Sequence, residues 1–186
     1  SEENTRGIIY IIRDPRDVCI SWANHTSKTF NESIEFMTND LASLLWTERE
    51  NKIFNTENKP LSFLSRWDKH VLSWTSNNWD CPLLVLKFED LVYKKEEMIK
   101  VIANFFIDRF GFKFNNLDNK IVNILETTNF QEFKKKELKD GFVEAQAGSQ
   151  FFKSGTKNQW KNKLNKEQIF KIEEKFKKIM NKFNYK

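Results

Sequence analysis

The chain has 186 residues, of which 39% are hydrophobic and 15% aromatic, so it can bury one ordinary core and is expected to form a single domain over residues 1–186. A charged fraction of 31%, without an apolar run near the ~20 residues that cross a bilayer, excludes a membrane span. The net charge of +5, with lysine concentrated from Lys134 onward, favours anionic partners but is also typical of a solvated surface.

The cysteines and the first residues of the sequence indicate where the protein is expected to reside and whether the chain is expected to be a fragment. Two cysteines are too few for a disulfide framework, and neither has the spacing of a metal site, so we expect no bound metal. No secretory signal opens the chain, which makes the cytoplasm the expected location. The sequence lacks an initiator methionine and reaches a strand-like run by Gly7, which favours a fragment of a longer polypeptide, although a natural edge strand would look the same.

The first predicted elements are a strand and a helix. Residues 7–12, GIIYII, show no alternation of polar and apolar side chains, which is typical of a strand buried on both faces of a parallel sheet. Asp14 is a suitable helix cap, Pro15 fits the first helical position, and Asp17 falls in the first turn. The sequence therefore predicts a strand that leads directly into a helix.

The same reading predicts the remaining elements. A second buried strand is expected over residues 82–88, a loop over 55–60, and an irregular segment over 133–151. Helices are predicted where apolar residues recur every three and four positions, over residues 33–54, 62–74, 95–106, 118–125 and 167–183. The last helix is expected to face a core, with a membrane surface as the less favoured partner. This order of elements predicts an α/β fold with a parallel sheet flanked by helices.

Arg13 is the first candidate ligand-binding residue. It follows a predicted parallel strand directly, at the edge of the sheet where ligands of such folds bind. A guanidinium matches phosphate oxygens, and the amides of a following helix add positive potential. With Asp14 as the cap, Ser21 lies on the same helix face seven residues later, roughly 10 Å along the axis. The pair predicts an anion site along the helix flank, whereas a lone arginine here is more often a surface charge.

The segment over residues 8–21, IIYIIRDPRDVCIS, resembles the 3′-phosphate-binding stretch of the sulfotransferase family. Members of this family use 3′-phosphoadenosine 5′-phosphosulfate (PAPS), and an arginine and a serine of the stretch hold the 3′-phosphate. The resemblance implies these roles for Arg13 and Ser21. It also implies a P-loop-kinase-like sulfotransferase fold.

Two later stretches resemble family motifs that surround the nucleoside. LKFEDL resembles a strand that ends in an aromatic residue, Glu, Asp and Leu, and implies that Phe88 lies near the adenine where the family commonly has tyrosine. TNFQE resembles the family stretch Thr-Ser-Phe-Gln-Glu. This second resemblance implies nucleoside contacts for Thr128, Asn129 and Phe130, with asparagine in place of serine.

A fourth motif, FFKSGTKNQWKN, covers residues 151–162 and resembles the family sequence Phe-Phe-Arg-Lys-Gly followed by Trp-Lys-Asn. In the family this motif closes over the 3′-phosphate, which implies cofactor contacts for Phe152, Lys153, Ser154 and Gly155. Lysine replaces the arginine and serine replaces the lysine, so a point charge and a hydroxyl stand where the family has a planar fork and an ammonium. The chain therefore departs from the family pattern in two of the groups on which cofactor affinity depends.

The resemblance implies a reaction but supplies no catalytic residue in this chain. The family transfers a sulfuryl group from PAPS to a hydroxyl or amine of an acceptor, here a small molecule or glycan. Its phosphosulfate-binding loop and catalytic histidine precede the Arg13 motif, which implies an N-terminally truncated domain and no catalytic assignment. His25 is expected to be a hydrogen-bonded side chain near a helix end, and His70 is expected to pack or to line an acceptor pocket. Trp46, Trp67 and Trp74 belong to a region that could shape an acceptor pocket, although such aromatic residues are more often core.

Two alternatives stand beside this interpretation. The chain could be a noncatalytic nucleotide-binding remnant, or a basic nucleic-acid-binding module. The second is disfavoured because no recognisable RNA- or DNA-binding motif is present, so no nucleic-acid partner is expected. The family's dimer signature would begin at Lys161, but Asn165, Lys166 and Phe170 depart from it, which argues against the usual dimer.

Overall fold

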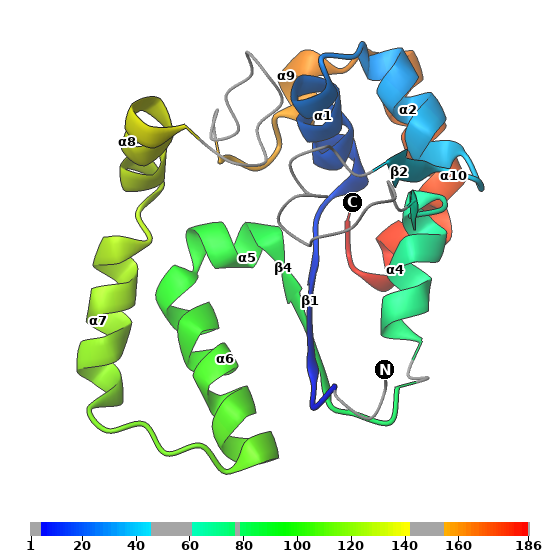
Figure 1. Cartoon of the computed structure of the whole chain (residues 1–186). Helices are drawn as coiled ribbons and strands as arrows, with labels where there is room; N and C mark the ends of the chain where they lie inside the picture. The colour runs from blue at the N-terminus through cyan, green and yellow to red at the C-terminus, as the bar shows by residue number, and fades with distance from the viewer. Residues whose placement is uncertain (1–4, 46–60, 77–78, 142–154, 186) are drawn as a thin grey trace.

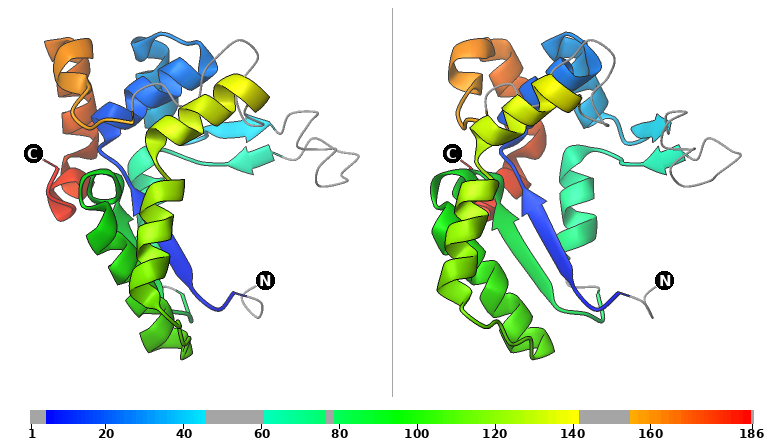
Figure 2. Two further views of the ribbon diagram at one scale, coloured as in Figure 1. Left: turned by 90° about the vertical axis from the view of Figure 1, so that its left-hand side faces the viewer. Right: turned by 60° about the vertical axis from the view of Figure 1, so that its left-hand side comes forward.

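Two short sheets organise the computed structural model, which describes residues 5–45, 61–76, 79–141 and 155–185 (Figure 1). Strand β1 (Ile8–Ile12) pairs in parallel with β4 (Leu83–Lys87). Strands β2 (Ser43–Leu45) and β3 (Leu61–Phe63) form an antiparallel pair. The second pair projects to one side of the molecule, away from β1 and β4 (Figure 2). The parallel pair confirms the predicted α/β class.

Helices cover the parallel pair from two sides. One group consists of α1 (Pro15–Thr26), α2 (Phe30–Thr38), α4 (Trp67–Thr75), α9 (Trp160–Lys163) and α10 (Lys166–Lys182). The other consists of α5 (Phe88–Tyr93), α6 (Lys95–Phe110), α7 (Leu117–Thr127) and α8 (Phe130–Asp140). Figure 1 shows α4 and α10 on one side of β1, with α5, α6 and α7 on the side of β4. No helix in the described ranges is both long and apolar enough to cross a bilayer.

The start of α1 follows the sequence prediction. Asp14 is its N-cap, and the Asp14 side chain accepts a hydrogen bond of 2.9 Å from the backbone N–H of Arg16. Pro15 occupies the first helical position, where its missing N–H removes no helical bond. The helix thus begins directly after β1 and carries Ser21 along its flank.

The core lies between β1, α1 and α10. Ile12, Ile20, Ile172, Phe176 and Ile179 are each at most 2% exposed. Burying side chains of this size stabilises the fold by about 1.5–3 kcal/mol each. The apolar face of α10 is therefore occupied by the domain core, which confirms the core interpretation of this helix and excludes the membrane-surface alternative for that face.

One expectation for β1 is wrong. Ile8 and Ile12 are buried, but Ile9 is 37% and Ile11 is 52% exposed, so among the described residues only one face of the strand is covered. On the covered face α4 packs against β1, whereas α6 packs against β4. An apolar run in a strand reports which side chains could be buried, but neighbouring elements decide which of them are.

The predicted helices over residues 33–54 and 62–74 are also wrong in extent. Helix α2 begins at Phe30 because Thr29 and Glu32 form a capping box, and it ends at Thr38. Strands β2 and β3 occupy 43–45 and 61–63, so α4 begins only at Trp67. Phe63 has helical spacing to Trp67 but lies in β3 and is 64% exposed. The predicted loop over 55–60 and Trp46 lie outside the described residues.

The structure also corrects the predictions for residues 133–151 and for the end of α6. The first part of the segment over 133–151 is helical, because α8 begins at Phe130 after Asn129, whose side chain accepts from the Gln131 N–H at 2.9 Å. Residues 142–151 lie outside the described residues. Helix α6 continues four residues beyond the predicted end and stops at Gly111, whose φ of 69° is in the left-handed region.

His70 of α4 belongs to an aromatic cluster on the covered face of β1. Its Nδ1 lies 3.1 Å from the Tyr10 hydroxyl, and its ring centroid is 6.5 Å from that of Trp74. Burial lowers the pKa of His70 and raises the pKa of Tyr10 to about 12. These contacts are those of a side chain packed among aromatic residues, one of the two roles expected for His70.

We expect His70 to make the stability of the fold depend on pH. Because burial lowers its pKa, the unfolded chain binds a proton below about 6.5 more readily than the folded chain does. The stability contributed by neutral His70 is complete above that pH and is lost as the pH falls through the lowered value. Urea unfolding from pH 5 to 8 should show a steeper rise in stability for the wild type than for His70→Gln. Parallel curves would contradict the assignment.

Candidate functional site

A cavity of about 590 Å³ opens at the carboxyl ends of β1 and β4, bounded by α1, α5 and the start of α8. The structure brings seven of the ten predicted site residues together in its lining: Arg13, Ser21, Phe88, Thr128, Asn129, Phe130 and Gly155. The other three, Phe152, Lys153 and Ser154, lie outside the described residues. No aspartate or glutamate occurs among the described lining residues, so the lining itself contributes basic and neutral side chains, while the carboxylates of Asp17 and Glu89 lie near Arg13.

Arg13 presents its guanidinium to this cavity from the end of β1. The guanidinium carbon lies 4.4 Å from the centroid of the Phe88 ring, which supports the planar group from α5. Its Nε is buried and has no hydrogen-bond partner among the described residues. Burial lowers the pKa of Arg13, while the nearby carboxylates of Asp17 and Glu89 raise it in part. A buried N–H donor without a hydrogen-bond partner suits an anionic ligand.

Arg16, one turn away, is engaged within the protein instead. Its Nε and one terminal nitrogen donate to the Asp14 carboxylate at 2.9 and 2.7 Å, and the other terminal nitrogen donates to Glu173 at 2.5 Å. The guanidinium carbon lies 3.9 Å from the Trp160 ring centroid, and the residue is 2% exposed. Burial alone would lower the pKa of Arg16, but the hydrogen bonds and charges of Asp14 and Glu173 together raise it. Arg16 therefore joins α1 to α9 and α10.

Asp17 attaches the segment after Gly155 to α1. Its carboxylate accepts from the backbone N–H of Asn158 at 2.7 Å and of Trp160 at 3.1 Å. Burial raises the pKa of Asp17, and these two hydrogen bonds lower it in part. The sequence placed Asp17 only in the first turn of a helix. No local pattern in the sequence indicates that Asp17 binds a segment more than 140 residues away.

Glu89 joins the end of β4 to two other parts of the site. One carboxylate oxygen accepts from the Asp14 backbone N–H at 3.0 Å, and the other accepts from the Tyr185 hydroxyl at 3.1 Å. Burial raises the pKa of Tyr185, and the charge of Glu89 raises it further. The carboxylate therefore fixes the start of α1, and with it Arg13, relative to Phe88.

Gly155 makes a close approach to the ring of Phe130. A Cβ atom at this position would lie 2.7 Å from two carbons of that ring, and φ is +57°, in the region that glycine tolerates best. The close approach places the Gly155 backbone beside an aromatic side chain of the cavity wall. Both features explain why glycine stands here.

We expect Gly155→Ala to destabilise the fold more than Gly111→Ala does. Gly111 has φ +69°, but a Cβ added there would meet nothing within 4 Å, so the two variants share only the left-handed backbone cost of about 1–2 kcal/mol. Only Gly155→Ala must also displace the Phe130 ring. Thermal or urea unfolding of the two variants measures the difference, and equal losses would contradict the close approach.

Four further polar residues line the cavity that the sequence did not assign to the site: Asn24, His25, Lys95 and Gln159. His25 lies one turn after Ser21 in α1, and its ring centroid is 6.0 Å from that of Trp22. Gln159 stands inside the fourth motif, so its position was a usable signal. Lys95 had none, because the packing of α6 against α7 brings it to the cavity. Trp67 packs on Phe176 in the core, with ring centroids 5.2 Å apart.

Comparisons with known proteins agree in one family. Residues 2–184 match the family model described as "Sulfotransferase domain". Luciferin sulfotransferase of Photinus pyralis is 28% identical over 184 residues, which cover 92% of this chain and 43% of that protein. Sulfotransferase 2A2 of Rattus norvegicus is 29% identical over 163 residues, covering 83% and 50%. The chain spans about half the length of these curated relatives.

Solved structures show the same fold. Mouse sulfotransferase SULT7A1 complexed with PAP superposes with a TM-score of 0.63 at 20% identity, covering 94% of this chain and 58% of that one. Retinol dehydratase in complex with androsterone and inactive cofactor PAP gives a TM-score of 0.65 at 20% identity, covering 96% and 48%. At this level of identity the likeness is one of fold.

Proposed function

The chain belongs to the sulfotransferase domain family, and from this premise we propose that its cavity binds the 3′-phosphate and adenine end of PAPS. The observation that carries the proposal is Arg13, whose buried Nε has no hydrogen-bond partner among the described residues and whose guanidinium lines a cavity without a described carboxylate. A phosphate would satisfy that donor and the positive charge together.

The lining residues divide into two proposed groups. Arg13 and the Ser21 hydroxyl hold the 3′-phosphate, since both line the cavity along the start of α1. The rings of Phe88 and Phe130 offer apolar faces to the base, which stacks on aromatic side chains. Thr128 and Asn129 lie at the same wall as Phe130 and are proposed to contact the nucleoside.

The fourth motif completes the proposed phosphate site. Gly155 brings its backbone close to Phe130, where an amide can reach the ligand without a side chain in the way. Phe152, Lys153 and Ser154 are proposed to close over the phosphate, although they lie outside the described residues. Lysine and serine supply a point charge and a hydroxyl to the anion.

In the proposed reaction PAPS supplies the sulfuryl group to a hydroxyl or amine of a small-molecule or glycan acceptor. The residues of this chain bind and orient the far end of the donor, so that its reacting end is held in a fixed position. No residue of the chain is proposed as the catalytic base. We place residues 1–186 within one sulfotransferase domain, and the two cysteines, both free, agree with a reducing compartment such as the cytoplasm.

Isothermal calorimetry with two nucleotides tests this function. Adenosine 3′,5′-bisphosphate should bind at least about a hundredfold more tightly than adenosine 5′-phosphate, because only the first can form charge-assisted hydrogen bonds through a 3′-phosphate. Equal affinities in a folded protein would refute a 3′-phosphate site. Tight binding of the bisphosphate without any sulfuryl transfer would favour the alternative of a noncatalytic nucleotide-binding protein.

A further inference from the structure

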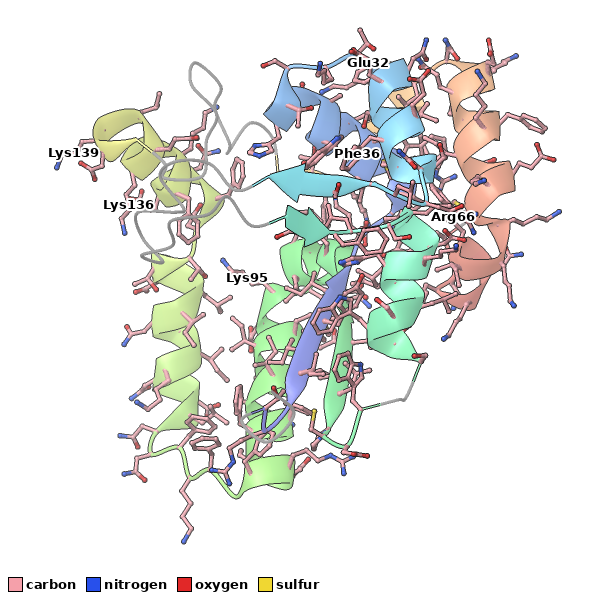
Figure 3. The ribbon with its side chains drawn as sticks, turned by 45° about the vertical axis from the view of Figure 1, so that its right-hand side comes forward. Glu32, Phe36, Arg66, Lys95, Lys136 and Lys139 are labelled. Atoms are coloured by element: carbon pink, nitrogen blue, oxygen red, sulfur yellow. The ribbon has the colours of Figure 1, made fainter. Side chains whose placement is uncertain are left out.

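Lys95 contributes a second cation to the cavity from an element other than the one that carries Arg13. It is the first residue of α6, lines the cavity, and is half-buried. Figure 3 shows its side chain reaching from the start of α6 toward the side on which α8 lies. Its ammonium has no ion pair with a carboxylate of the described residues. The positive charge of Lys95 therefore faces the cavity and the residues that join α7 to α8.

The ammonium of Lys95 donates to the backbone carbonyl of Thr128, which lies between α7 and α8. An ammonium has three N–H donors, so two remain for another partner. Burial lowers the pKa of Lys95, because the charged form loses part of its hydration. A ligand that accepts a hydrogen bond here would replace that lost hydration.

Thr128 has no hydrogen-bond donor left for a ligand, although its hydroxyl oxygen can still accept a hydrogen bond from the nucleoside. Its backbone N–H and its hydroxyl both donate to the carbonyl of Ile124, at 2.9 and 2.5 Å, and its carbonyl accepts from Lys95. The neighbouring wall residues Phe88 and Phe130 carry aromatic rings without N–H or O–H donors. Lys95 is thus a charged donor with unused capacity at this wall, beside the neutral side-chain amide of Asn129.

We propose that Lys95 donates a hydrogen bond to a ring nitrogen of the purine base bound in the cavity, which makes it a binding residue of the nucleotide site. The inference rests on the proposed function and adds the group that recognises the base. Lys95 is tied to Thr128, directly before the Asn129–Phe130 wall on which the base would stack, whereas the 3′-phosphate is assigned to Arg13 and Ser21 on α1. We therefore assign the base, and not the 3′-phosphate, as its acceptor.

Calorimetry with purine analogues tests this contact. The ligands are adenosine 3′,5′-bisphosphate and its 1-deaza, 3-deaza and 7-deaza forms, in which one ring nitrogen is replaced by C–H. In the wild type, one analogue should bind about tenfold or more weakly than the parent, the effect of one charge-assisted hydrogen bond. In Lys95→Met the parent should weaken by a similar factor, and that analogue should lose its disadvantage.

Matched variants separate binding from support of Thr128. Lys100 lies on the same helix, is exposed and pairs with Glu96, so Lys100→Met should bind all four ligands as the wild type does. If Lys95 only supported the Thr128 carbonyl, Lys95→Met would weaken the parent and every analogue by the same factor, and this result would overturn the inference. Lys95→Gln, which keeps an N–H donor near Thr128, should also remove the analogue's disadvantage.

The two proposals fail in different ways. Loss of preference for the bisphosphate over adenosine 5′-phosphate in the wild type would refute the proposed function. A preserved preference, with all three analogues equal to the parent or with no coupling to Lys95, would leave the phosphate site intact and refute only the role of Lys95. Each outcome is read from the same set of titrations.

Discussion

Replacement of Arg16 by methionine is expected to lower the free energy of unfolding by about 3–5 kcal/mol, the range found when one partner of a buried ion pair is removed. Arg16 is 2% exposed, and it hydrogen-bonds to Asp14 and Glu173 while its guanidinium stacks on Trp160. Methionine fills part of the volume but leaves the buried Asp14 carboxylate without its cation. That carboxylate also caps α1, so the change acts on the element that carries the site.

Urea unfolding of Arg16→Met and Arg66→Met provides the measurement and its control. Arg66 also bonds to an aspartate, Asp68, at 2.8 Å, but its side chain is 22% exposed and lies at the start of α4. Because the side chain of Arg66 is more exposed than that of Arg16, we expect Arg66→Met to lower the free energy of unfolding less than Arg16→Met does. Similar losses in the two variants would show that the contacts of Arg16 do not connect α1 to α9 and α10 as described.

Replacement of Arg13 by alanine should weaken binding of adenosine 3′,5′-bisphosphate by about a hundredfold, which corresponds to about 3 kcal/mol for a charge-assisted contact in a partly buried site. Binding of adenosine 5′-phosphate should change far less, since it has no 3′-phosphate to lose. Arg13→Lys should lie between the wild type and Arg13→Ala, because an ammonium keeps the charge but not the planar fork.

Arg13→Ala should destabilise the fold less than Arg16→Met does. The guanidinium of Arg13 contacts the Phe88 ring and lies near the carboxylates of Asp17 and Glu89, but its Nε has no hydrogen-bond partner among the described residues that the change would leave unsatisfied. Arg109, exposed near the end of α6, offers a matched control, and Arg109→Ala should bind both nucleotides normally. An Arg13→Ala protein that loses affinity for both nucleotides equally would contradict the assignment of Arg13 to the 3′-phosphate.

Periodicity and local capping signals in the sequence predicted the elements that hold the site. The apolar run before Arg13 became β1, and Asp14 with Pro15 began α1 where expected. The spacing between Arg13 and Ser21 then placed both at one cavity, because helix geometry is regular enough to fix which residues share a flank. The Thr29–Glu32 capping box is also a local signal. It marks the true start of α2, which the predicted helix over residues 33–54 did not take into account.

Other features depend on contacts between distant segments and could not be predicted from local patterns. The apolar spacing of Phe63 suits a helix, but its pairing with Ser43 in the antiparallel β2–β3 pair decides its conformation. The bonds from Asp17 to Asn158 and Trp160 join residues more than 140 positions apart. Lys95 reaches the cavity because of how α6 packs beside α7, which its neighbours in the sequence do not indicate.

A crystal structure of the chain with adenosine 3′,5′-bisphosphate would test the central claim most directly. The account predicts the 3′-phosphate in the cavity, with its oxygens about 3 Å from Arg13 Nε and from the Ser21 hydroxyl. The base should lie at the wall formed by Phe88 and Phe130. A nucleotide bound with its 3′-phosphate away from Arg13, or outside this cavity, would contradict the account.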